Sequence, residues 1–175
     1  MGLPYNRPVR RLLPVILTLG AVGWSAALFL APYALSSRNP RLIAAAASIY
    51  QASGLICHQR SARSFHLAGV QQPVCARCTG LYVSATAGAL AAWLLSRRPA
   101  VPRRSRPVLA LAALPTALSV ALEFAGFVHP SNTVRALCAL PLGAAAAWIV
   151  VQSLRAEAAG KGGVLLAADR STQPR

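Results

Sequence analysis

Most of the residues in this chain that could do chemistry lie in one short polar segment between long apolar runs. The segment contains Cys57, His58, His66, Cys75 and Cys78. Thiolate sulfur and imidazole nitrogen are ligands that zinc prefers, and structural zinc sites usually combine two pairs of ligands joined by a loop. Cys75 and Cys78 form a C-x-x-C pair. Cys57 and His66 can supply the second pair, with His58 as a substitute or supporting donor, because adjacent side chains diverge.

The same cysteines are also suited to thiol-disulfide exchange. A C-x-x-C pair at a helix N-terminus has its thiolate stabilised by the helix dipole, and Arg77 adds positive charge between the two cysteines. In this alternative, Cys75 is the nucleophile and Cys78 or Cys57 is its resolving partner. A static disulfide among these cysteines is a further alternative. The sequence therefore indicates a zinc or other transition-metal site, and it leaves catalytic residues and enzyme activity open.

A second polar group centres on Glu123, which lies inside an apolar run. A carboxylate in a membrane span is rare and is usually paired or functional. Arg135 is the first candidate for its partner and Arg77 the second. The pair would either fix two helices together or serve a small-molecule transporter or carrier.

Composition indicates which elements must position these groups. The chain has 175 residues, of which 55% are hydrophobic and 12% charged, a composition unlike that of a soluble domain. A helix of about 20 apolar residues crosses a bilayer. We expect an all-α, polytopic membrane protein with four transmembrane helices, at residues 12–35, 79–95, 108–128 and 136–154. Residues 42–56 are apolar but short for a crossing, so we expect a re-entrant or interfacial helix there.

The net charge of +15 does not indicate nucleic-acid binding, because the arginines flank apolar spans. Positive charge favours the cytoplasmic side, which predicts a bacterial inner-membrane protein with both termini inside. The predicted division is a cytoplasmic N-terminus at 1–11, one transmembrane domain at 12–154 with an extracytoplasmic insert at 36–78, and a flexible cytoplasmic tail at 155–175. The lipid bilayer is the one partner that the sequence indicates.

Small residues recur at four-residue spacing in two of the predicted spans. They are Gly80, Ser84 and Gly88 in the second span, and Ala139, Gly143 and Ala147 in the fourth. Such ridges allow membrane helices to approach closely. We expect these two faces to be packing seams.

Three short motifs in the polar segment resemble those of a known family. They are Cys57-His58-Gln59-Arg60, Arg63-Ser64-Phe65-His66, and the run from Pro73 to Tyr82. The segment from Cys57 to about Gly143 resembles a family of uncharacterised prokaryotic membrane proteins catalogued as domain of unknown function family 2085. This chain has Ser61 where members often have proline, Ser119 where they tend to be acidic, and Ala139 where they have glycine. The resemblance implies an integral membrane protein with this polar insert and implies no activity.

Overall fold

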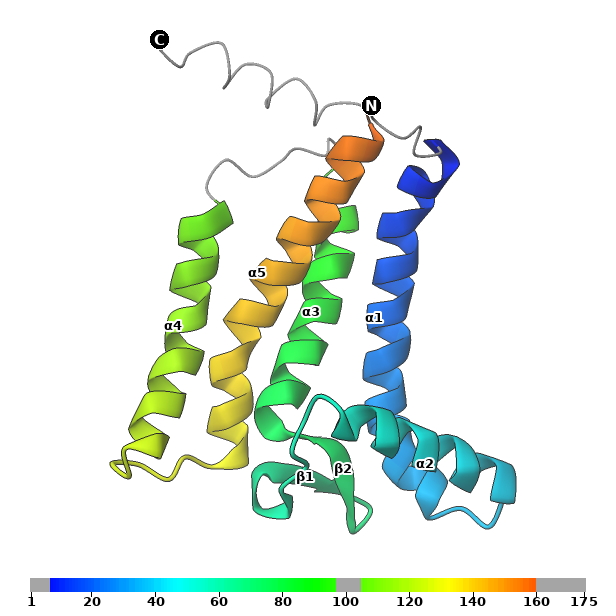
Figure 1. Ribbon diagram of the computed structural model, residues 1–175, viewed down its shortest axis with the longest axis vertical. Coiled ribbons are helices and arrows are strands. Elements are labelled where there is room, and N and C mark those ends of the chain that lie inside the picture. The colour runs from blue at the N-terminus through cyan, green and yellow to red at the C-terminus, as the bar shows by residue number, and fades with distance from the viewer. Residues whose placement is uncertain (1–6, 97–104, 160–175) are drawn as a thin grey trace.

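The structure is a computed structural model that describes residues 7–96 and 105–159, with side chains from residue 12 onward (Figure 1). Within these ranges the chain is mostly helical, with five α-helices and one small sheet. The elements are α1 (Arg7–Leu35), α2 (Pro40–Gly54), β1 (Ser64–Leu67), β2 (Val70–Cys75), α3 (Ala76–Leu94), α4 (Ser105–Phe124) and α5 (Asn132–Ala158).

Four long helices, α1, α3, α4 and α5, lie side by side and form the body of the molecule (Figure 1). The α5 helix contacts each of the other three, whereas α4 lies at the edge and packs mainly against α5. The start of α1 and the end of α5 lie at one end of the bundle, and the β1–β2 hairpin lies at the other. The chain therefore places its polar insert opposite its first and last described helical turns.

Three of these helices are long and apolar enough to cross a membrane: α1 from Leu12 to Leu35, α4 and α5. The α3 helix is not among them, so the fourth predicted crossing is not confirmed by hydropathy. The reason is that α3 carries small and polar residues that serve its neighbours. Its Thr86 hydroxyl donates to the Ala21 carbonyl of α1 at 2.9 Å, and Ser25 of α1 shares a 2.8 Å hydrogen bond with Thr86.

The predicted seam between the second and fourth spans is confirmed as the contact between α3 and α5. A Cβ atom added to Gly80 would overlap the carbonyl oxygen of Ala136, and one added to Gly88 would overlap that of Ala144. From the other side, a Cβ on Gly143 would overlap the carbonyl oxygen of Leu81. The backbones of the two helices are thus in direct contact at three glycines, as small-residue ridges allow.

The insert forms a short helix and a hairpin, where the sequence predicted only the helix. Residues 42–56 fall largely within α2, which lies across the end of the bundle beside α1 and β2 (Figure 1). The expectation of an all-α fold is corrected by the antiparallel pair β1–β2. Ala68 and Gly69 form its turn with positive φ angles of 51° and 77°, which is the backbone of a two-residue hairpin turn.

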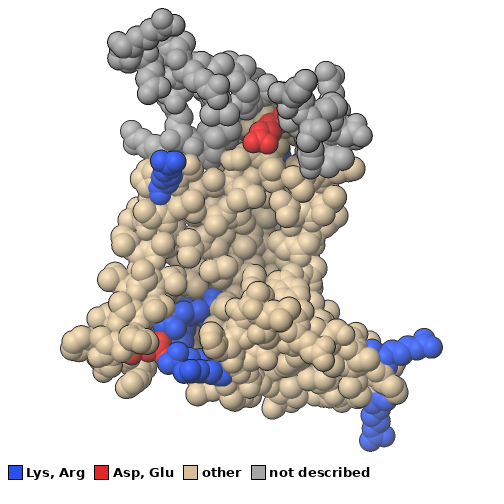
Figure 2. Space-filling view, viewed as in Figure 1, with Lys and Arg blue, Asp and Glu red and all other residues tan. Residues whose placement is uncertain are grey.

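Charged side chains lie towards the two ends of the face shown in Figure 2, with a broad uncharged belt between them. This distribution suits a protein whose middle contacts hydrocarbon. The predicted N-terminal segment and tail are described only in part: α1 begins at Arg7 and α5 continues to Ala158, past the predicted boundary at 154. Residues 1–6, the arginine-rich stretch 97–104 and residues 160–175 lie outside the described part of the chain.

Candidate metal and thiol site

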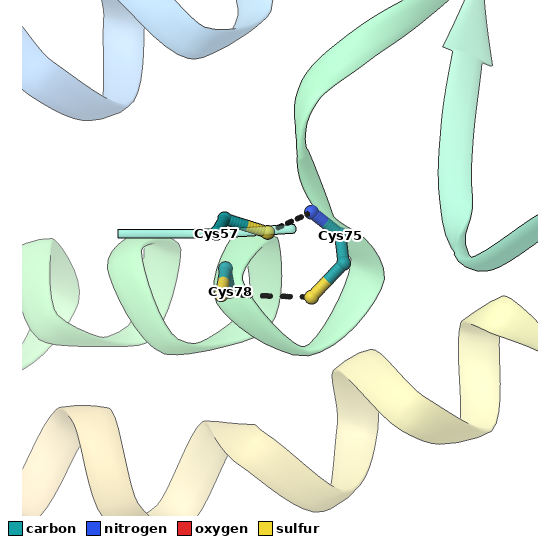
Figure 3. A group of neighbouring side chains, drawn as sticks. All are labelled: Cys57, Cys75 and Cys78. Atoms are coloured by element: carbon teal, nitrogen blue, oxygen red, sulfur yellow. Dashed lines mark hydrogen bonds between the residues drawn. The ribbon is translucent and has the colours of Figure 1, made fainter. Parts of the chain in front are cut away.

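Three cysteine side chains meet at the end of the bundle where the hairpin joins α3 (Figure 3). Cys57 follows α2, Cys75 ends β2 and is the N-cap of α3, and Cys78 lies in the first turn of α3. Their sulfur atoms all lie within 4.8 Å of one another. The site therefore draws its donors from three different elements.

Two hydrogen bonds join the three cysteines. The backbone N–H of Cys75 donates to the sulfur of Cys57 at 3.2 Å, and the sulfur atoms of Cys75 and Cys78 lie 3.5 Å apart. Such donors favour a sulfur that carries negative charge. The hydrogen bond with Cys78 lowers the pKa of the Cys75 thiol to about 5, against the smaller opposing effect of burial. Cys75 also lies at the positive end of the α3 dipole, which acts in the same direction.

An apolar cluster that includes a residue of α1 packs against the cysteines. Cys57 and Val74 are buried with Leu28 of α1, and Trp24 and Tyr82 pack against this cluster. The site is thus anchored to α1 as well as to α3, which limits how far the sulfurs can separate.

A network of amide hydrogen bonds fixes the connection between α2 and the hairpin. The Gln59 side chain donates to the carbonyl oxygens of Tyr50 and Pro73, at 2.7 and 2.9 Å. Gln71 donates to the Gln59 carbonyl at 2.6 Å, and the Tyr50 hydroxyl donates to the Gln71 carbonyl. Gln59 has a φ angle of 48°, a left-handed conformation that this network supports. The network places Cys57 opposite the end of β2.

His66 is not among the residues that the structure brings together at the thiols. In β1 it pairs with Gln71, four residues along β2 from Cys75, so it lies roughly 13 Å away at the usual rise of a strand. Its Nε2 atom lies 3.3 Å from the Ser61 hydroxyl, and the side chain is exposed. The expected donor set with His66 is therefore not assembled here, because the segment folds as a hairpin that carries this residue away. His58, the alternative donor, lines the same cavity as the three cysteines.

Glu123, near the end of α4, contacts both of its predicted partners and a third arginine. Its carboxylate lies 2.5 Å from Arg77 of α3, 2.8 Å from Arg135 of α5 and 3.2 Å from Arg63 beside β1. The carboxylate is almost fully buried, with a side-chain exposure of 7%. Arg77 also donates to the Ser119 carbonyl at 3.3 Å. One carboxylate therefore joins α4 to α3, α5 and the hairpin.

The thiols and the arginines line one cavity of about 350 Å³. Its wall comprises Ile56, Cys57, His58, Gln59, Arg60, Arg63, Cys75, Arg77, Cys78, Phe124 and Arg135. The two polar groups that the sequence suggested separately are thus neighbours in space. The contribution of Arg63 and the role of Gln59 were not predicted, although both lie within the family-like motifs around Cys57 and His66.

Comparison with known proteins places the matched region around this site. Residues 57–149, more than half of the chain, match the family described as Predicted membrane protein (DUF2085). An uncharacterized protein of Methanothermobacter thermautotrophicus is 34% identical over 89 residues, which cover 50% of this chain and 78% of the relative. An uncharacterized protein of Methanocaldococcus jannaschii is 29% identical over 87 residues, covering 50% of this chain and 56% of the relative. No solved structure matches the chain.

Proposed function

This chain belongs to the DUF2085 family of predicted membrane proteins, and we propose that it is a four-span protein of a prokaryotic cytoplasmic membrane with a zinc site at its outer face. The observation that carries the zinc proposal is the convergence of three cysteine sulfurs, from the segment after α2, from β2 and from α3, within 4.8 Å. The metal would link the hairpin and the segment after α2 to α3, at a place where apolar packing already brings them together.

The fourth span in this proposal is α3. Its 19 residues extend about 28 Å at the rise of an α-helix, close to the thickness of the hydrocarbon core. Its polar side chains bond to neighbouring helices, as polar groups in membrane helices do. Four crossings put both termini on one side, and the arginines near residues 7–11 and 97–106 favour the cytoplasm for that side. Residues 1–11 and 155–175 are then cytoplasmic, and the insert 36–78 is outside.

The donor geometry supports zinc. Sulfur atoms bound tetrahedrally at about 2.3 Å from zinc lie roughly 3.8 Å apart, and the observed Cys75–Cys78 separation is 3.5 Å. The N–H of Cys75 that donates to Cys57 would stabilise a metal-bound thiolate. Three thiolates leave one tetrahedral position. His58, the histidine in the cavity wall, or a water molecule could fill it.

The test is elemental analysis of protein purified in detergent under reducing conditions, with a count of free thiols on the same sample. We expect about one zinc per chain, as a closed tetrahedral site holds one ion. Cys57→Ser, Cys75→Ser and Cys78→Ser should each lose most of the metal. Cys138→Ser is the matched control, because Cys138 is outside the group of mutually close donors.

Absence of metal from wild-type protein whose three thiols are free and accessible would contradict the zinc proposal. Equal loss of metal from the Cys138→Ser control would also contradict it, since a general loss of folding would then explain the other variants.

The second candidate function is thiol-disulfide exchange, and the low pKa of Cys75, about 5, favours it. The Cys75 thiolate would attack a substrate disulfide and release a substrate thiolate. The Cys78 thiolate, with its sulfur 3.5 Å away, would then attack the Cys75 sulfur of the mixed disulfide and release the second substrate thiolate, so that two electrons pass to the substrate and a Cys75–Cys78 disulfide forms. A Cys78→Ser variant should trap the mixed disulfide on Cys75. Tightly held stoichiometric metal would argue against this candidate.

The Glu123 cluster favours a structural clamp over a carrier for small molecules. Both carboxylate oxygens already accept from arginines: Arg63 and Arg135 contact Oε1, and Arg77 and the Nε of Arg135 contact Oε2. A carboxylate that binds and releases a proton or a substrate must be able to give up its protein partners. The Glu123 carboxylate is instead paired with arginines from three different parts of the chain. We propose that its role is to keep α4 against the rest of the bundle.

A further inference from the structure

The cavity beside the thiols has an excess of positive charge in its wall. Four guanidinium groups line it, those of Arg60, Arg63, Arg77 and Arg135. Among the described residues the carboxylates are Glu123, which contacts three of them, and Glu157, which lies near the far end of α5. Glu123 compensates one of the four positive charges, so three remain without a compensating group. Two would still remain if zinc with three thiolates, which carries one net negative charge, occupied the thiol site.

Some of the hydrogen-bond donors in this wall also lack partners. A guanidinium has five N–H donors, and one carboxylate has about four lone-pair sites. The guanidinium of Arg60 makes no ion pair within the described part of the chain. The N–H donors in this wall therefore outnumber the acceptor sites of its one carboxylate. The excess of positive charge and of donors indicates a ligand that is an anion rich in acceptor oxygens.

The shape of the cavity limits the size of that anion. Its volume of about 350 Å³ lies at the lower end of the range for small-molecule pockets. Ile56 and Phe124 form apolar parts of the wall, and both are exposed, Phe124 to 95%. A compact charged head with a short apolar portion fits this lining. Arginine forks match phosphate oxygens in pairs, which favours phosphate over halide.

We propose that this cavity is a binding site for a phosphate-type oxyanion, presented by a small phosphate ester or by the head group of an anionic phospholipid. The arginines and not the thiols carry this inference, so it goes beyond the zinc proposal and does not depend on it. The position of the site at the end of the bundle suits either source, because the ends of the spans lie near the head groups.

The first test is calorimetric titration of detergent-purified protein with inorganic phosphate, against sodium chloride at matched ionic strength. We expect saturable binding to wild type and to the metal-depleted protein. Binding should weaken about tenfold in Arg60→Gln and further in Arg60→Gln/Arg63→Gln, as for the loss of hydrogen bonds to a charged group. Arg60 has no ion-pair partner among the described residues, so the single variant should fold normally.

The matched control is Arg38→Gln/Arg41→Gln, which removes the same charge just before and within the first turn of α2, outside the cavity wall. A second arm places the protein in nanodiscs of phosphatidylcholine with or without phosphatidylglycerol and measures retained lipid by native mass spectrometry. Phosphate binding without lipid retention would identify a soluble ester, and retention lost in the Arg60→Gln/Arg63→Gln variant would identify a head group. Saturable binding of neither probe, or equal weakening in the Arg38→Gln/Arg41→Gln control, would overturn the proposal.

Discussion

Replacing Glu123 by glutamine should destabilise the protein more than any other change of a single charge. The substitution keeps the size of the side chain but removes the negative charge that three arginines share. Arg135 and Arg77 are mostly buried, with side-chain exposures of 10% and 17%, whereas Arg63 is 43% exposed. The two buried arginines would be left as uncompensated charges, and the exposed one would lose little.

The magnitude follows from this burial. Removing one partner of a buried ion pair costs about 3–5 kcal/mol, while an exposed pair contributes about 0–1 kcal/mol. We therefore expect a loss of about 3–5 kcal/mol in the free energy of unfolding for Glu123→Gln. For a chain of this size that corresponds to a melting temperature roughly 6–20 °C lower. Because α4 packs mainly on α5, proteolysis in α4 should be the first sign of the loss.

The measurement is thermal unfolding in detergent, with Glu157→Gln as the control because that carboxylate is exposed near the end of α5. A double variant, Glu123→Gln/Arg135→Met, separates charge from packing: it should recover part of the loss, since one of the buried charges is removed as well. A melting temperature for Glu123→Gln within 2 °C of the Glu157→Gln control, a margin of about one kcal/mol or less, would refute this reasoning.

Three further predictions concern the seam, the thiol and the histidines. Gly143→Ala should lower the free energy of unfolding by about 1–3 kcal/mol, because the added methyl group overlaps Leu81. Gly23→Ala, which has open space around its Cβ, should stay within about 1 kcal/mol of wild type in the same unfolding assay. In metal-free protein, alkylation of Cys75 should be half-maximal at about pH 5. Between that pH and the ordinary thiol pKa of about 8.5, the free energy of unfolding should rise with pH, because the unfolded chain binds a proton that the folded chain does not. An alkylation midpoint near pH 8.5 would contradict this prediction. His66→Ala should keep the zinc content of wild type, and a loss of metal by elemental analysis would show that the imidazole reaches the site.

The helices could be predicted from the sequence because their signal is local. The first span ends at Leu35 in both the prediction and the structure. The fourth span was predicted to start at 136, because the prediction followed the apolar run. The helix begins at Asn132, where the Ser131 hydroxyl accepts from the N–H of Val134 at 3.3 Å. A capping serine next to a turn was the available signal.

The hairpin could not be predicted with the same ease. Its β2 strand has two adjacent glutamines and a proline in place of clean alternation, and its turn is Ala68-Gly69 rather than Asn-Gly. This single omission explains why the sequence grouped His66 with the thiols. The cysteines themselves were identifiable from residue type and spacing, but the position of the imidazole depends on the strand register.

The α3 helix connects the packing of the bundle to the geometry of the thiols. Cys78 and Gly80 both lie within the first two turns of α3, and the α3 backbone contacts α5 at Gly80. The C-x-x-C pair is therefore positioned by helix packing and by the apolar cluster around Leu28 and Val74, without any need for a metal. Small zinc domains that lack such a core unfold when the metal is removed. Here the site is preorganised, so metal removal should leave the helical content unchanged while it frees the thiols, and binding should not require ordering of the chain.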